Sequence, residues 1–160
     1  MKAPKVIFLD VDGVLNCGQT RIKCCGFTGV DDDKCMLFTE LVERTGAKVV
    51  LSSTWRKFPD MLPYLWEHLG EAVHAAVIGQ TLVLESRAVG GSGLWVGVTR
   101  GDEIADWLKR HPLVRDFVIL DDDGDMGALE PFLVRTDWQT GLTKERADEA
   151  ARRLNGEVAK

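Results

Sequence analysis

Residues 5–15, KVIFLDVDGVL, decide the expected fold. The apolar run is continuous, as in a strand of a parallel sheet that is covered on both faces. It ends at two carboxylates, Asp10 and Asp12, and the chain then turns at Gly13. Two like charges beside a buried strand are costly unless a cation or a proton shares their site. The stretch therefore predicts a buried first strand that ends in a site needing a positive partner.

Further apolar runs alternate with helical segments along the chain. The runs span residues 47–53, 116–120 and 132–136, and the helical segments span residues 31–45, 59–76, 102–111 and 144–154. The expected N-caps are the acids at 31–33, Asp102 and Thr143. Strands that alternate with helices form parallel sheets with helices on both faces. The pattern predicts a three-layer, doubly wound (Rossmann-like) α/β fold.

Length and composition indicate one domain over residues 1–160. The chain has an apolar fraction of 45% and a net charge of −5, which argues against indiscriminate nucleic-acid binding but allows a local basic groove. No apolar run approaches the roughly 20 residues of a membrane span, and the N-terminus does not resemble a signal peptide. We expect a cytoplasmic protein without membrane contact, and nothing indicates an obligate protein partner.

The four cysteines all lie before residue 36. Their spacing, C-x6-C-C-x9-C, lacks the C-x2-C pairs of most zinc sites. Because no secretion signal precedes them, we expect reduced thiols rather than a zinc site or disulfides. They are Cys17, Cys24, Cys25 and Cys35.

Polar side chains follow three of the strands at the point where each strand ends. These residues are Asp10 and Asp12, then Ser52 and Ser53, then Asp121 and Asp122. Ligands of such sheets bind at the carboxyl ends of the strands. Carboxylates without histidine or cysteine partners favour Mg²⁺ over zinc. A calcium-binding loop at residues 121–132 is excluded because Met126 and Phe132 occupy its glycine and glutamate positions.

Carboxylates that hold Mg²⁺ next to hydroxyl groups are typical of a phosphate-handling site. Asp10 can serve there as a nucleophile that forms an aspartyl-phosphate. Asp12 can protonate the leaving oxygen and later take a proton from the attacking water. The sequence thus predicts a Mg²⁺-dependent phosphohydrolase.

Several short stretches of this sequence resemble the motifs of a known enzyme superfamily. FLDVDGVL at residues 8–15 resembles the first motif of the haloacid dehalogenase (HAD) superfamily, and VVLSS and VILDD resemble its second and fourth. LSSTWR, VIGQT, EIADWL and TDWQTGLT are similar to the HAD-type domain of Swiss Army knife RNA repair proteins. The resemblance covers residues 6 to about 145. It implies a HAD-like phosphatase with a minimal cap or none, acting on nucleic-acid ends.

Carried onto this sequence, the resemblance implies that Asp10 is the nucleophile and Asp12 the general acid/base. It also implies a set of Mg²⁺ ligands: the carboxylates of Asp10 and Asp121, the backbone carbonyl of Asp12, and Asp122 directly or through water. These four residues form the expected metal site.

The resemblance further implies a hydroxyl and a cation that contact the phosphoryl group. Ser52 is the expected hydroxyl, with Ser53 as the alternative one residue on. The third HAD motif supplies a cation, and this sequence has no single clear match to it. We favour Arg100 over Lys109 because a guanidinium can bind phosphate oxygens bidentately.

Two segments stand where caps occur in HAD enzymes. Residues 16–30 form only a flap, read as a loop or small hairpin, and residues 57–99 must also supply the crossover of the sheet. An open site suits a phosphate on something large, such as an RNA or DNA end. A phosphoprotein or a small phosphate ester is the alternative substrate.

Residues around the second strand are candidate substrate contacts. Ser53, Thr54 and Arg56 are expected to touch the substrate, and Arg56 would join Arg21, Lys23 and Lys57 in a basic rim. Ordinary surface charge explains that rim equally well. Trp55 either stacks on a base or packs beneath the flap.

A receiver-like signalling domain is the alternative from another class. It also combines an α/β sheet, Mg²⁺ and a phosphorylated aspartate. It needs no acid two residues after that aspartate, so Asp12 favours the enzyme.

Overall fold

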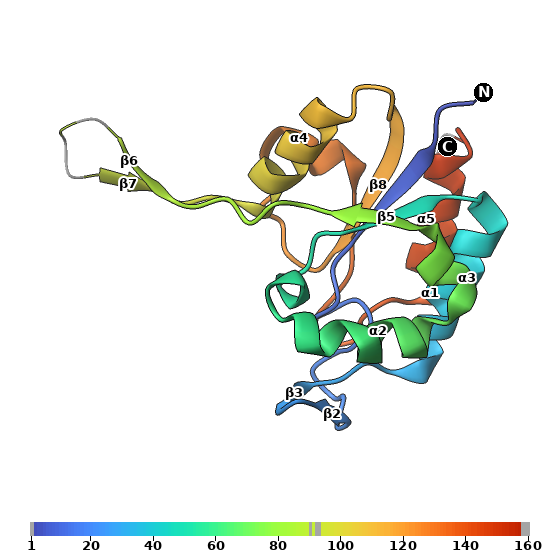
Figure 1. The fold of residues 1–160 in the computed structure, drawn as a ribbon. Helices are drawn as coiled ribbons and strands as arrows, with labels where there is room; N and C mark the ends of the chain where they lie inside the picture. Colours follow the sequence, from blue (N-terminus) through green and yellow to red (C-terminus); the bar gives the residue numbers. More distant parts are fainter. Residues whose placement is uncertain (1, 90, 92–93, 158–160) are drawn as a thin grey trace.

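The computed structural model describes residues 2–89, 91 and 94–157 (Figure 1). Its centre is a five-stranded sheet in which every neighbouring pair is parallel. Leu9 pairs with Leu51 on one side and Leu120 on the other, so the three central strands end side by side. The strands are, in spatial order, β5 (Val77–Gln80), β4 (Lys48–Leu51), β1 (Lys5–Leu9), β8 (Asp116–Asp121) and β9 (Leu133–Arg135).

Helices cover both faces of the sheet. Ile7 and Leu9 of β1 pack into a core with four helices, whereas Val6 and Phe8 pack on the opposite face. This alternation is what a strand buried on both faces requires, and the predicted three-layer, doubly wound fold is confirmed. The first face carries α1 (Asp32–Thr45), α2 (Leu62–Leu69), α3 (Glu71–Ala76) and α5 (Lys144–Leu154); the second carries α4 (Arg100–Arg110) and the 3-10 helix η3 (Gly127–Phe132).

Some element boundaries differ from the sequence expectation. The helix expected over residues 59–76 is a short 3-10 helix, η2 (Pro59–Met61), followed by α2 and α3 on either side of Gly70. The N-cap of α4 is Thr99, not Asp102. Asp102 is the third residue of the helix, and the two residues form a capping box in which each side chain accepts a hydrogen bond from the backbone N–H of the other. The cap at Thr143 is confirmed. Of the expected GGSG connection at 90–93, residues 90, 92 and 93 lie outside the described residues.

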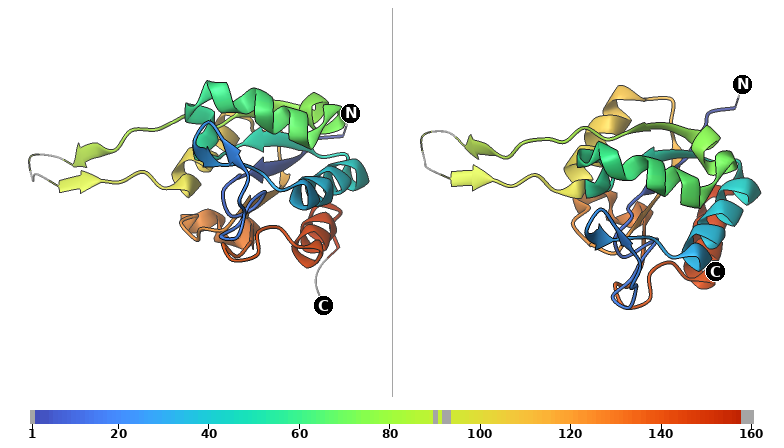
Figure 2. Two further views of the ribbon diagram at one scale, coloured as in Figure 1. Left: turned by 90° about the horizontal axis from the view of Figure 1, so that it is seen from below. Right: turned by 60° about the horizontal axis from the view of Figure 1, so that its bottom comes forward.

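Two hairpins project from the body. The flap contains β2 (Lys23–Cys24) and β3 (Phe27–Thr28), so the hairpin alternative for residues 16–30 is confirmed. A second hairpin, β6 (Arg87–Val89) and β7 (Leu94–Val96), lies at the end of the arm, which we define as residues 81–99. The arm leaves the end of β5, returns to the start of α4 and extends away from the body (Figure 2).

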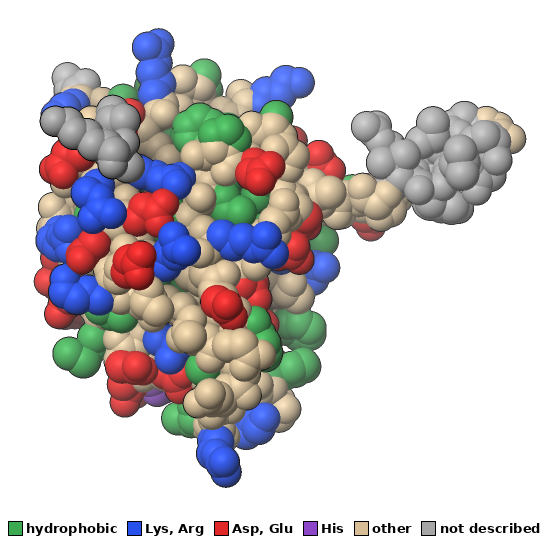
Figure 3. All heavy atoms as spheres, turned by 180° about the vertical axis from the view of Figure 1, so that it is seen from behind, with side chains coloured by type: hydrophobic (Ala, Val, Ile, Leu, Met, Phe, Trp, Pro, Cys, Tyr) green, Lys and Arg blue, Asp and Glu red, His purple; other side chains and the backbone are tan. Residues whose placement is uncertain are grey.

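The surface charges and the cysteines give little further indication of a binding site. Acidic and basic side chains are interspersed over the face seen in Figure 3. All four cysteines are free thiols, and no group of three candidate ligands that includes a cysteine gathers among the described residues. In the part of the chain that the structure describes, every helix is too short or too polar to cross a membrane.

Candidate active site

The strand ends bring the predicted acids together. One carboxylate oxygen from each of Asp10, Asp121 and Asp122 lies within 4.8 Å of the others. The backbone helps to hold this edge, because the Asp10 N–H donates to the Leu120 carbonyl at 3.0 Å and the Ser52 N–H to the Leu9 carbonyl at 2.9 Å. Residues more than a hundred positions apart thereby form one acidic cluster.

Gly13 makes room for the third member of this cluster. Its φ is +81°, and a Cβ added there would lie 2.3 Å from the carboxylate carbon of Asp122. A side chain would be strained by the backbone and would also displace that carboxylate. The Thr136 hydroxyl donates to the Gly13 carbonyl at 2.6 Å and fixes the turn. The glycine after the D-x-D pair therefore serves the acidic cluster directly.

The acidic cluster lacks sufficient positive charge of its own. Burial raises the pKa of Asp10 to about 6, although the charge of Arg100 opposes the rise. Burial, reinforced by the charge of Asp10, raises the pKa of Asp121 to about 9. Burial also raises the pKa of Asp122. Carboxyls in this state gain much from a cation that shares their oxygens.

The donor set fits Mg²⁺. All three side chains offer carboxylate oxygens, which are the hard ligands that this ion prefers. The Oδ2 atom of Asp121 is buried and has no hydrogen-bond partner among the described residues, and its nearest cation, the Arg100 Nε, is 3.8 Å away. The Asp12 carbonyl and a water-mediated role for Asp122 stay predictions.

The Asp12 carboxylate is held by two side-chain hydrogen-bond donors. The Asn16 Nδ2 atom donates to its Oδ1 at 2.9 Å, and the indole Nε1 of Trp55 donates to the same oxygen at 3.2 Å. Asn16 is fully buried and also receives the Gly13 N–H at 2.9 Å. Two donors on one oxygen fix the carboxylate and leave its second oxygen for proton transfer.

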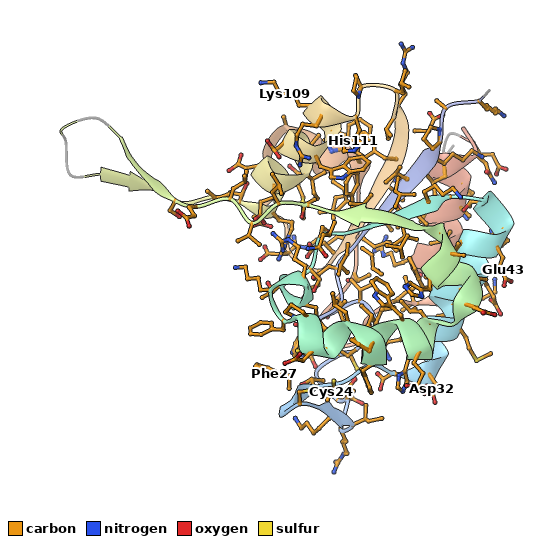
Figure 4. All side chains as sticks on the ribbon, viewed as in Figure 1. Cys24, Phe27, Asp32, Glu43, Lys109 and His111 are labelled. Atoms are coloured by element: carbon orange, nitrogen blue, oxygen red, sulfur yellow. The ribbon has the colours of Figure 1, made fainter. Side chains whose placement is uncertain are left out.

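Arg100 lies next to the acidic cluster and lines the same cavity, which we call the acidic pocket. This pocket has a volume of about 150 Å³ and is also lined by Asp10, Asp12 and Asp121. The Arg100 guanidinium donates to the Ser52 carbonyl and to the Thr54 hydroxyl. Lys109 is exposed near the other end of α4, as Figure 4 shows. Of the two candidates, the geometry favours Arg100.

The hydroxyl groups after β4 differ in their occupation. The Ser52 hydroxyl is buried without a hydrogen-bond partner in the described residues. The Ser53 hydroxyl accepts from the Trp55 N–H at 3.1 Å as the cap of the 3-10 helix η1 (Thr54–Lys57). Thr54 is exposed and lines the acidic pocket. Of the two serines, Ser52 is therefore the one whose hydroxyl lacks a partner in the described residues, and its contact with a phosphoryl group stays a prediction.

Arg56 does not belong to a substrate rim. Its side chain is 0% exposed and forms an ion pair with Glu103 at 2.6 Å. The guanidinium also donates to the carbonyls of Ser53 at 2.8 Å and Thr81 at 3.0 Å. The turn of η1 directs this arginine inward, so the expectation of a substrate contact is corrected. The other predicted rim residues, Arg21, Lys23 and Lys57, are exposed.

Sequence reasoning missed residues that act through others. Asn16 follows the first motif closely, and its position after D-x-D-G-V-L was the available signal. Trp55 is only 3% exposed and its ring lies beside Tyr64, which favours packing over base stacking for that tryptophan. The Asp125 carboxylate accepts the Arg100 N–H at 3.0 Å. Gly101 lets α4 pack against the backbone at Met126, because a Cβ at position 101 would lie 2.4 Å from the Met126 carbonyl oxygen.

A doubly wound sheet with D-x-D after its first strand and paired acids after β8 defines a HAD-type domain. The family model described as the HAD domain in Swiss Army Knife RNA repair proteins matches residues 6–147. The chain therefore belongs to this family, which is one of phosphatase-type hydrolases. A comparison with curated proteins found no match.

Proposed function

We propose that this chain is a Mg²⁺-dependent phosphomonoesterase that removes phosphate from nucleic-acid or nucleotide ends through an aspartyl-phosphate. The observation that carries the proposal is the convergence of Asp10, Asp121 and Asp122 beside an Asp12 whose carboxylate is separately held. Mg²⁺ bound there would neutralise charge on the phosphate oxygens. A phosphorylated substrate follows from that chemistry.

The two acids of the first motif would divide the reaction. The Asp10 carboxylate attacks phosphorus, the bond to the ester oxygen breaks, and the leaving oxygen takes the proton of Asp12. Water then attacks the aspartyl-phosphate, gives its proton to the Asp12 carboxylate and releases inorganic phosphate. Arg100 and the Ser52 hydroxyl would hold the phosphoryl oxygens during both steps.

The site's surroundings support a large substrate. The described part of residues 57–99 forms α2, α3, β5, short 3-10 turns and the outward-pointing arm (Figure 1). The family description names RNA repair proteins. Both observations favour an end of a nucleic acid over a small ester that a cap would enclose.

The test is a substrate panel with matched variants. Oligonucleotides with 3′- or 5′-phosphate, nucleotides, phosphopeptides and sugar phosphates are compared with and without Mg²⁺. We expect release from nucleic-acid ends, abolished in Asp10→Asn, and a slow or trapped phosphoenzyme in Asp12→Asn. Full activity of Asp10→Asn would overturn the mechanism, and a preference for sugar phosphates or phosphopeptides would overturn the substrate class.

A further inference from the structure

An aromatic cavity adjoins the acidic pocket and has no part in the steps described above. It has a volume of about 280 Å³ and shares Asp12 and Thr54 with the acidic pocket. Its remaining wall includes Phe27, Phe58 and Trp138. The cavity therefore opens directly beside the group that would protonate the leaving oxygen.

The three aromatic side chains come from separate parts of the chain. Phe27 lies on the β2–β3 hairpin (labelled in Figure 4), Phe58 follows η1 and Trp138 lies between β9 and α5. They are 52%, 41% and 44% exposed, respectively. The rings of Phe27 and Phe58 touch, with centroids 5.4 Å apart. Core packing does not explain three half-exposed rings around one cavity.

We propose that this cavity binds the nucleobase of the nucleotide that carries the scissile phosphate, by stacking on Phe27, Phe58 or Trp138. The proposal rests on the proposed function and names the part of the substrate that the site recognises. The volume lies just below the roughly 300 Å³ at which drug-sized pockets begin, which suits one flat ring system with its sugar. With a phosphate at Asp10, the leaving oxygen faces Asp12 and the sugar and base continue into the cavity.

The lining also indicates how selective the subsite is. Its polar side-chain groups are the Asp12 carboxylate, the hydroxyls of Thr28 and Thr54, and the indole N–H groups of Trp55 and Trp138, of which that of Trp55 is already bonded to Asp12. Aromatic faces stack on every base, so stacking gives affinity with little sequence preference. We therefore expect the enzyme to prefer an end that carries a base over an abasic one, with little difference among the four bases.

The experiment compares two oligonucleotides that differ only in the terminal, phosphate-bearing nucleotide, which carries a base in one and is abasic in the other. Both are prepared with the phosphate at either end. For the unaltered protein we expect KM to be roughly tenfold lower for the base-bearing end, as loss of one stacked base predicts. At least one of Phe27→Leu, Phe58→Leu and Trp138→Leu, which replace an aromatic side chain by an apolar one, should bring this ratio close to one, and Phe27→Trp, which keeps an aromatic ring, should preserve it.

A matched control uses an aromatic residue far from the cavity. Phe132 is 37% exposed and stacks on Phe117 on another part of the surface. Phe132→Ala should leave the ratio of the two KM values unchanged. A ratio near one in the unaltered protein, or a ratio that survives in Phe27→Leu, Phe58→Leu and Trp138→Leu, overturns the base subsite.

Failure of the subsite and failure of the proposed function give different results. If base-bearing and abasic ends are both hydrolysed equally well, the phosphatase stands and the subsite falls. If neither end is hydrolysed while phosphopeptides are, the substrate class and the subsite fall together. Binding of a nucleoside monophosphate to Asp10→Asn, followed by tryptophan fluorescence, gives a readout without turnover. This binding should be weakened when the leucine substitution that brings the KM ratio close to one is added to Asp10→Asn.

Discussion

Two clusters of buried charge lie near the carboxyl edge of the sheet, and they differ in how they are satisfied. The Arg56 guanidinium pairs with Glu103 and donates to backbone carbonyls, and Glu103 also accepts the Leu84 N–H at 3.0 Å. In the acidic cluster, by contrast, Asp121 keeps a buried oxygen without a partner in the described residues. A complete cluster stabilises the fold, whereas an incomplete one indicates what the protein must bind.

The largest expected effect breaks the complete cluster. Arg56→Met removes the hydrogen-bonded cation of the buried Glu103 carboxylate and leaves it only the more distant Arg100, 3.6 Å away, so we expect the free energy of unfolding to fall by about 3 kcal/mol. Urea denaturation measures the loss. Arg44→Met removes an arginine that is paired with Asp148 on the surface, and it should lower the free energy of unfolding far less, because solvent screens exposed ion pairs. Equal losses in the two variants would refute the structural role assigned to Arg56.

The second prediction concerns the effect of adding Mg²⁺ to the acidic cluster. Mg²⁺ at about 100 times its dissociation constant should stabilise the folded protein by about 2.7 kcal/mol, because the ion binds only the folded state. Asp121→Asn should lose this stabilisation without unfolding. Thermal unfolding with Mg²⁺ and with a chelator measures both. Equal stabilisation of the unaltered protein and Asp121→Asn would remove Asp121 from the metal site.

The third prediction concerns pH in a chelator. Asp10 and Asp121 have pKa values of about 6 and about 9 against an ordinary 3.8, so the folded state binds protons more tightly than the unfolded state. Their contribution to stability is fully present below about pH 4 and is lost as the pH rises through 6 and 9. We expect the free energy of unfolding to fall continuously between pH 5 and 8, because in this range both carboxyls hold protons more tightly in the folded state than in the unfolded state.

The pH effect has its own control. Asp121→Asn removes one of the two titrating groups, so its unfolding free energy should depend less on pH than that of the unaltered protein. Saturating Mg²⁺ should weaken the dependence in the unaltered protein as well. Parallel curves for the unaltered protein and Asp121→Asn would contradict the assignment.

The smallest expected effect tests how Asp12 is held. Trp55→Phe removes the indole donor to its Oδ1, and we expect a loss of about 1 kcal/mol in transition-state stabilisation. Alkyl phosphates should lose more activity than aryl phosphates, because an aryl leaving group needs less help from a proton donor. Trp66→Phe, which alters a tryptophan stacked on His74, is the matched control. An equal loss on both substrate types would indicate a merely structural role.

The sheet and the acidic cluster could be predicted because both depend on local sequence. An apolar run that ends in acids specifies a buried strand, and parallel strands bring their ends together whatever lies between them. The convergence of Asp10 and Asp121 could therefore be predicted from the sequence.

The residues that sequence reasoning misplaced depend on where short turns point. Whether Arg56 faces solvent or Glu103 is decided by η1, which has no periodicity to read. The same holds for Asn16, whose amide reaches Asp12 and the Gly29 carbonyl only after the flap has folded back. The aromatic cavity joins residues from three loops, and no spacing in the sequence connects them.

The arm has a further consequence for how this chain can change. The first segment of the arm is tied to the start of α4, because the Leu84 N–H donates to Glu103 and Arg56 binds both Glu103 and the Thr81 carbonyl. When the ends of a loop are already held together, each doubling of its length costs only about 0.6 kcal/mol of chain entropy. A longer connection between β6 and β7 would therefore cost the fold little, which makes the arm a position where this domain could acquire a cap.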